Sequence, residues 1–158
     1  MPQTNASLIS MRNFFLPAII ALSLTGCAQA VSLEAAQDAN NPACAEVMVR
    51  LPAALGEHDI RYTNAQATAA WGNPAAILLR CGLEPVEVSA LPCVTAGSTD
   101  WLVDESQAPN FRFISYATTP AVEVVVNSEQ ASGVTALEGL SQAISVLPRT
   151  NVCTSLGD

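Results

Sequence analysis

The most constraining feature of this 158-residue sequence is its set of five cysteines, one of which follows a short apolar run near the N-terminus. The run extends from Phe14 to Leu24, and the only positive charge before it is Arg12. A membrane-spanning helix needs about 20 apolar residues, so this run is too short for one and is typical of a secretory signal. Export would place the cysteines in a compartment where disulfides form.

The residues Leu-Thr-Gly-Cys at positions 24–27 resemble a bacterial lipobox. In that resemblance, cleavage leaves Cys27 as the first mature residue, with lipid on its sulfur and on its amino group. The alternative is a plain signal peptide with an incidental cysteine. Residues 1–10 are uncharged and add nothing to a signal, so Met11 is an alternative translation start to Met1.

The sequence predicts a lipoprotein signal peptide at residues 1–26, a flexible tether at 27–41 and a single disulfide-braced domain at 42–158. The tether is rich in Ala, Gln and Asn and has no strong apolar periodicity. Removal of the signal peptide would leave five arginines against 14 acids. Such a surface does not bind anionic headgroups by electrostatics, so lipid on Cys27 would anchor the domain at the extracytoplasmic face of the membrane.

The other four cysteines are expected to form two disulfides. Three connectivities are open, and the preferred pairs are Cys44–Cys81 and Cys93–Cys153. Each pair would close a loop of several tens of residues and stabilise the fold by about 4 kcal/mol in the chain-entropy model. A Cys₄ zinc site is the alternative use, although the chain has no Cys-x-x-Cys pair, as a zinc ribbon or a thioredoxin-like site would need.

The scarcity of cationic side chains excludes several classes of function. All six basic residues are arginine, and His58 is the single histidine. A phosphate-binding P-loop and a Schiff-base enzyme each need a lysine, and a two-histidine metal site cannot form within one chain. Non-specific nucleic-acid binding needs a basic face, which a chain of net charge -8 does not offer. We therefore expect no cofactor, no metal and no nucleic-acid partner.

Two helices are predicted, one at each end of the domain. Asn41 and Pro42 are typical of a helix start, and Pro52 limits the helix that follows. The apolar face of this helix comprises Cys44, Val47, Met48 and Leu51. The second helix is indicated by the capping-box pattern Thr135-x-x-Glu138 and ends at Pro148. Its apolar stripe comprises Val134, Leu137, Leu140, Ile144 and Leu147.

About five short strands are predicted between these helices from alternating or continuous apolar residues. The segments are 75–81, 86–90, 100–104, 111–117 and 121–127, the last two as antiparallel neighbours. Residues 57–70 are interpreted as polar loop or weak helix, 71–74 as a turn and 91–99 as a loop. The expected fold class is α+β: a two-layer sandwich in which an antiparallel sheet of about five strands packs against both helices.

Several short motifs follow one another along the domain. They are Cys44 with Leu51-Pro52, Trp71-Gly72-x-Pro74, Leu79-Arg80-Cys81-Gly82, Trp101-Leu102 and Ala121-Val122-Glu123-Val124. In this order they resemble an uncharacterised actinobacterial family, domain of unknown function 3515, over most of residues 43–147. The resemblance implies that Cys44 and Cys81 are the usual pair, that Cys93 with Cys153 is an additional one, and that the protein is exported or lipid-anchored. It implies no activity, substrate or catalytic residue.

Candidate catalytic residues are few. His58 with Asp59 invites comparison with a Ser-His-Asp triad, but no Gly-x-Ser-x-Gly or other nucleophile motif accompanies them, so an exposed loop residue is the preferred interpretation of His58. Asp100, Asp104 and Glu105 suggest paired carboxylates for glycan hydrolysis. Asp100 and Asp104 would lie roughly 13 Å apart on one strand, too far for that pair, so we interpret these acids as solvated residues at a loop edge.

Arg80 is the most informative polar residue, because an arginine within an apolar strand needs a partner. The preferred partner is an acid such as Glu87 or Glu123, in an internal ion pair. In the alternative, Arg80 binds an anion or carboxylate ligand near Trp71, which would stack on the same ligand.

The expected function is that of a lipid-anchored cell-envelope protein whose domain binds a protein or wall component without catalysis. One alternative is a cell-wall hydrolase that uses carboxylates or His58. Another is a structural subunit whose sheet face packs on a membrane complex.

Overall fold

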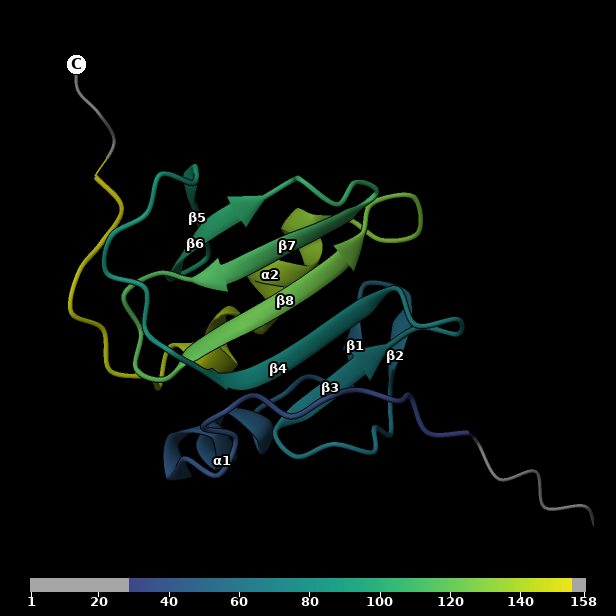
Figure 1. Cartoon of the computed structure of the whole chain (residues 1–158). Coiled ribbons are helices and arrows are strands. Elements are labelled where there is room, and N and C mark those ends of the chain that lie inside the picture. Colours follow the sequence, from purple (N-terminus) through teal and green to yellow (C-terminus); the bar gives the residue numbers. More distant parts are fainter. Residues whose placement is uncertain (1–28, 155–158) are drawn as a thin grey trace, which may run out of the picture.

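The computed structural model describes residues 29–154, which form one eight-stranded antiparallel sheet and two helices (Figure 1). The elements are α1 (Pro42–Met48), β1 (Ala54–Leu55), β2 (His58–Arg61), β3 (Thr68–Trp71), β4 (Ile77–Leu83), β5 (Cys93–Ala96), β6 (Thr99–Asp104), β7 (Asn110–Ser115), β8 (Ala121–Asn127) and α2 (Gly133–Ile144). The strand order is β1-β2-β3-β4-β8-β7-β6-β5. The predicted signal peptide, both candidate start methionines and Cys27 lie outside the described residues.

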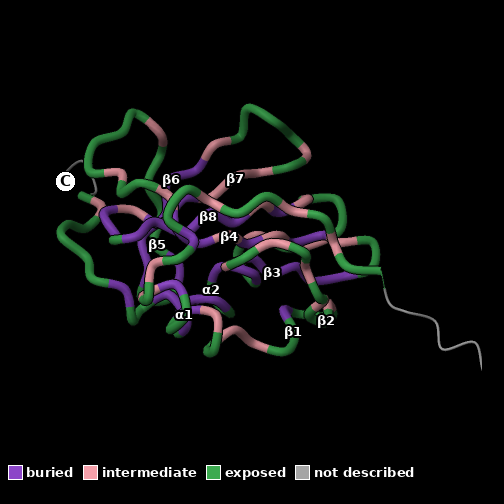
Figure 2. Tube along the Cα trace, turned by 60° about the horizontal axis from the view of Figure 1, so that its bottom comes forward, coloured by how far each residue is buried: buried purple, intermediate pink, exposed green. Residues whose placement is uncertain are grey.

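The two helices pack on one face of the sheet, so the predicted α+β sandwich is present (Figure 1). Alternation along β4 and β8 explains which of their residues face the helices, because successive side chains of a strand point to opposite sides of the sheet. The buried residues that β4 and β8 direct toward the helices are Ile77, Leu79, Cys81, Val122, Val124 and Val126. The opposite face, called the open face below, carries the polar residues of the same strands. Figure 2 shows that buried residues gather along the sheet and α2, whereas exposed residues lie in the peripheral loops.

The predicted number of strands was wrong, since the sheet has eight strands and not five. Four predicted strands correspond to β4, β6, β7 and β8, but residues 86–90 form a loop in which Val88 is exposed. β3 was missed because all four of its residues, Thr-Ala-Ala-Trp, are buried, so it has no alternating pattern. β5 was missed because it is a mostly exposed edge strand within residues 91–99, which were interpreted as a loop.

The helix ends follow local hydrogen bonding. The side-chain oxygen of Asn41 accepts a hydrogen bond from the Ala43 N–H and caps α1, as predicted, although α1 ends at Met48. α2 begins earlier than the predicted capping box, because the Ser132 hydroxyl accepts the Thr135 N–H and caps the helix there. Neither of the two described helices is long and apolar enough to cross a membrane.

The segment before α1 packs on the domain, whereas a flexible tether was expected over residues 27–41. The Val31 N–H donates to the Tyr62 carbonyl at 2.8 Å, and the Asp38 N–H donates to the Gly82 carbonyl at 2.9 Å. Gly82 permits this approach, because its φ is +108° and a Cβ there would lie 2.5 Å from the Asp38 carbonyl carbon. These contacts use backbone groups, which apolar periodicity does not reveal. The folded domain therefore begins near Val31, and this segment runs over the open face at β3 (Figure 1).

Two disulfides brace the fold, and both join the cysteines that were paired from the sequence. Cys44–Cys81 connects α1 to β4, and both of its residues are fully buried. Cys93–Cys153 connects the edge strand β5 to the C-terminal segment. The helix-side core and one sheet edge are thus each fixed by a covalent bond.

Candidate functional site

Three adjacent strands place charged side chains side by side on the open face. Arg80 of β4 lies directly opposite Glu123 of β8 in the antiparallel register. On the other side, Glu123 lies opposite Ile114 of β7, two residues along that strand from Arg112. A carboxylate at the centre can therefore reach arginines on both neighbouring strands.

Both carboxylate oxygens of Glu123 are occupied by these arginines. The Arg80 Nε donates to Oε1 at 2.7 Å, and the Arg112 Nε donates to Oε2. The Glu123 side chain is only 8% exposed, whereas the two arginine side chains are each 36% exposed. The internal ion pair preferred for Arg80 is present, and Glu123 is its partner.

Sequence reasoning missed Arg112. The same signal that identified Arg80 could have found it, because Arg112 also lies among apolar residues in the strand sequence Phe-Arg-Phe-Ile. Glu87, the other partner considered for Arg80, instead accepts a hydrogen bond from the Thr150 hydroxyl.

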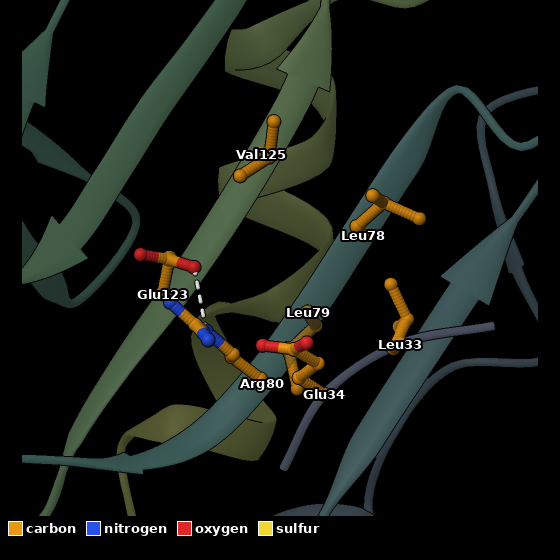
Figure 3. Close-up of a pocket in the computed structure, with 7 residues that line it drawn as sticks. All are labelled: Leu33, Glu34, Leu78, Leu79, Arg80, Glu123 and Val125. Carbon is orange, nitrogen blue, oxygen red and sulfur yellow. Dashed lines mark hydrogen bonds and ion pairs between the residues drawn. The ribbon is translucent and has the colours of Figure 1, made fainter. Parts of the chain in front are cut away.

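Two neighbouring hollows on the open face share Arg80, and we call them together the arginine groove. The first, drawn in Figure 3, has a volume of about 120 Å³ and is lined by Leu33, Glu34, Leu78, Leu79, Arg80, Glu123 and Val125. The second measures about 360 Å³ and is lined by Ala35, Ala36, Gln37, Arg80, Leu83, Glu84, Val86, Arg112 and Ile114. The segment that precedes α1 forms one wall of both hollows, so its packing on the domain creates the groove.

The arginine groove has the chemistry of an anion site. Each arginine uses Nε for Glu123, and no described residue accepts a hydrogen bond from the Nη atoms of Arg80 or Arg112. Two guanidinium groups around one carboxylate leave an excess of one positive charge. Guanidinium Nη groups bind carboxylates and phosphates with paired hydrogen bonds. Glu34 and Glu84 also line the walls, so an anionic group would have to reach the arginines between two further carboxylates.

Trp71 does not share this groove, so the structure contradicts the alternative in which Trp71 stacks on a ligand beside Arg80. Trp71 is fully buried, and its Nε1 donates to the Pro52 carbonyl at 3.1 Å. In the β3–β4 register Trp71 pairs with Ile77, which faces the helices. Trp71 therefore packs in the core, on the face opposite to Arg80.

His58 lies in β2 and is half-buried, not in an exposed loop as expected. One ring nitrogen, Nε2, lies 3.0 Å from the Gln130 carbonyl oxygen. Because neighbouring strand residues point to opposite faces, the Asp59 side chain is directed away from the imidazole. No hydroxyl among residues 29–154 is hydrogen-bonded to the His58 ring, so the described chain does not assemble a Ser-His-Asp triad.

The remaining candidate acids have different environments. Asp100 is buried: its carboxylate accepts hydrogen bonds from the Thr95 hydroxyl at 2.6 Å and from the Cys153 N–H at 2.9 Å. Its interpretation as a solvated residue was therefore wrong, since it holds the C-terminal segment on β5 and β6. Asp104 and Glu105 lie at the outer end of β6, and within the described part of the chain no three His, Cys, Asp or Glu side chains are grouped to hold a metal ion.

Comparison with known proteins gave one match. The model of a family described as "Protein of unknown function (DUF3515)" matches residues 16–152. This range contains Arg80, Arg112 and Glu123 and stops one residue before Cys153. No curated protein and no solved structure matches the chain.

Proposed function

The chain belongs to the family "Protein of unknown function (DUF3515)", and from this premise we propose that it is a lipid-anchored cell-envelope domain that binds an anionic ligand without catalysis. The ligand would be a protein or wall component that presents a carboxylate or phosphate group to the arginine groove. The observation that carries this proposal is the pair of half-exposed arginines, Arg80 and Arg112, held by one buried carboxylate with their Nη groups unengaged by described residues.

Two independent features support the proposed location. The first is the sequence, in which a short apolar run is followed directly by the lipobox-like Leu24–Cys27. The second is the pair of disulfides, which form and persist in oxidising compartments outside the cytoplasm. Cys27 would carry the lipid, since the other four cysteines are paired with one another.

The geometry gives less support to the two other candidate functions. A hydrolase would need convergent acids or a free base, whereas Asp100 is engaged through both oxygens and His58 is engaged through Nε2. A structural subunit would need a large exposed apolar patch. The exposed valines of the described chain instead lie on separate elements, for example Val88 in a loop and Val134 on α2.

The proposal is tested by thermal unfolding of the lipidated protein in detergent, with and without added anions. The probes are soluble muropeptides, which carry carboxylates, and inorganic phosphate. Binding in the arginine groove would raise the melting temperature of the wild type and leave Arg112→Ala unchanged. Arg112→Ala keeps the Arg80–Glu123 pair, so a folded variant is expected.

Arg50→Ala is the matched control, because Arg50 is an exposed arginine just after α1 that pairs locally with Glu46, four residues earlier. It should respond to the probes as the wild type does. The proposed binding site is wrong if neither probe stabilises the wild type, or if Arg112→Ala and Arg50→Ala are stabilised equally.

A further inference from the structure

The first described residues are held at the edge of the sheet, beside the chain that leaves β2. The Val31 N–H donates to the Tyr62 carbonyl at 2.8 Å, and the Asn64 N–H donates to the Val31 carbonyl at 3.2 Å. The Arg61 Nη2 donates to the Gln29 carbonyl at 2.8 Å. The backbone is therefore fixed on the domain as far back as Gln29.

Gln29 stands two residues after Cys27 in the sequence. Two residues of extended chain span at most about 7 Å, so the Cα atoms of Cys27 and Gln29 are no farther apart than that. Lipid attached to Cys27 would consequently bring this part of the domain surface to the membrane. Since Val31 is only two residues beyond Gln29, no long spacer separates the lipid from the sheet edge.

We call the surface formed by residues 29–33 and 60–66 the N-terminal corner. It presents Tyr62, whose exposed fraction is 86%, and Ile60, whose exposed fraction is 42%. Tyrosine is enriched where membrane meets water, because its ring is apolar and its hydroxyl remains hydrated. An exposed tyrosine next to an exposed isoleucine is thus suited to the headgroup region of a bilayer.

The charge of the N-terminal corner differs from that of the protein as a whole. The chain has 14 acidic residues, yet none occurs in residues 29–33 or between Ile60 and Leu83. Arg61 is the one charged residue of the corner. The N-terminal corner itself therefore carries no carboxylate that anionic headgroups would repel, and the exposed acids Glu34 and Asp59 stand at its borders.

We propose that the N-terminal corner rests on the lipid bilayer with Tyr62 at the level of the headgroups. The domain is then held against the membrane and not at the end of a flexible tether. This inference rests on the proposed attachment of lipid to Cys27. The occupant of the corner is the bilayer, because the covalent distance to Cys27 leaves no room for a globular partner between them.

The test places a tryptophan at the corner and measures its quenching by lipid. Tyr62→Trp is introduced into the full lipidated protein, which is reconstituted into vesicles of phosphatidylethanolamine and phosphatidylglycerol, with or without a phosphatidylcholine brominated on its acyl chains. The native Trp71 and Trp101 are both fully buried and supply a constant background. The brominated lipid is expected to reduce the emission of Tyr62→Trp relative to the parent protein.

Val88→Trp is the matched control. Val88 is 90% exposed, in a loop whose backbone pairs with Ala117 after β7, toward the other edge of the sheet. Its emission should not change with brominated lipid. Equal quenching of both variants, or no quenching of Tyr62→Trp, overturns the orientation.

The mass of the N-terminal peptide and flotation with vesicles separate the two proposals. If Cys27 carries lipid and the protein floats but Tyr62→Trp is not quenched, only the orientation fails. If Cys27 carries no lipid, the proposed anchoring and the orientation fail together.

Discussion

Glu123 lies directly opposite Arg80 across the β4–β8 pair, and its Oε1 accepts a hydrogen bond from the Arg80 Nε at 2.7 Å. The other carboxylate oxygen accepts a hydrogen bond from Arg112 of β7. One buried carboxylate therefore links three adjacent strands on the open face. It also holds the two guanidinium groups together, which would otherwise repel each other.

Replacing Glu123 by alanine is expected to lower the free energy of unfolding by roughly 2 kcal/mol, because two half-exposed arginines lose the charge that compensates them. Urea denaturation followed by circular dichroism measures the change. Glu46→Ala is the control, since the ion pair of Glu46 with Arg50, just after α1, is solvent-exposed, and a loss below about 0.5 kcal/mol is expected there. Equal losses would contradict a structural role for Glu123.

Gly82→Ala is expected to loosen the segment that precedes α1, because the new Cβ would collide with the Asp38 backbone. The cost should be roughly 2 kcal/mol in the free energy of unfolding, including the strain of a left-handed φ. Amide hydrogen exchange at Asp38, which donates to the Gly82 carbonyl, should accelerate in the variant.

Gly56→Ala provides the comparison for this glycine. Gly56 also has a positive φ, +60°, but its added Cβ would meet only Thr135 Cγ2 at an ordinary 3.6 Å. Protection at Asp38 should stay as in the wild type. If Gly82→Ala leaves that protection unchanged too, the segment is not held by this contact.

The two disulfides are expected to differ in their resistance to reduction. Cys44 and Cys81 are fully buried, whereas Cys93 is exposed and Cys153 half-buried, so dithiothreitol should reduce Cys93–Cys153 first in the folded protein. Alkylation of free thiols followed by mass spectrometry gives the order. In urea both bonds should be reduced at similar rates. Simultaneous reduction under native conditions would show that burial does not protect Cys44–Cys81.

The pKa of Asp104 is expected to lie below its ordinary value. Hydrogen bonds from the Ser106 side chain, and then from its backbone N–H, lower the pKa of Asp104 below the ordinary 3.8. The folded pKa of Asp104 lies below the unfolded one, so the ionised carboxylate stabilises the folded state. This stabilisation is present above the unfolded pKa and is lost as the pH falls through the folded pKa. An NMR titration of the carboxylate should show the pKa of Asp104 rising in Ser106→Ala.

Ser89→Ala controls for the loss of a loop serine, because the Ser89 hydroxyl accepts a hydrogen bond from the Leu91 N–H in a different loop. It should leave the titration of Asp104 unaltered. An unchanged pKa of Asp104 in Ser106→Ala would remove the Ser106 hydroxyl as a cause, because alanine keeps the backbone N–H.

The elements that were predicted correctly are those whose pattern is local. β8 alternates Val122, Val124 and Val126 with Glu123, and the structure places the valines in the core and the glutamate on the open face. The cap of α1 at Asn41 is likewise a contact between near neighbours in the sequence. Such features depend on few residues, so a single sequence suffices to predict them.

The missed features depend on contacts between distant segments. The face on which Trp71 lies follows from its pairing with Ile77 in the β3–β4 ladder, and the four buried residues of β3 give no alternating pattern that would indicate this face. The packing of Val31 on the domain depends on the backbone of Tyr62 and Asn64. For the candidate site, the need of Arg80 for an acid was predictable and the same pattern marks Arg112, whereas the sharing of Glu123 by both arginines follows from the strand order β4-β8-β7.

The two disulfides divide the chain into two covalent rings that follow each other in sequence. The ring closed by Cys44–Cys81 contains β1 to β3 and most of β4, and the ring closed by Cys93–Cys153 contains β5 to β8 and α2. These rings are also the two halves of the sheet, which meet only where β4 pairs with β8 (Figure 1). A single proteolytic cut inside either ring leaves its pieces covalently joined. Only a cut between Cys81 and Cys93 separates the rings, and the two halves would then be held together by the β4–β8 ladder, the Arg80–Glu123 ion pair and the packing of α2 against α1 and β1.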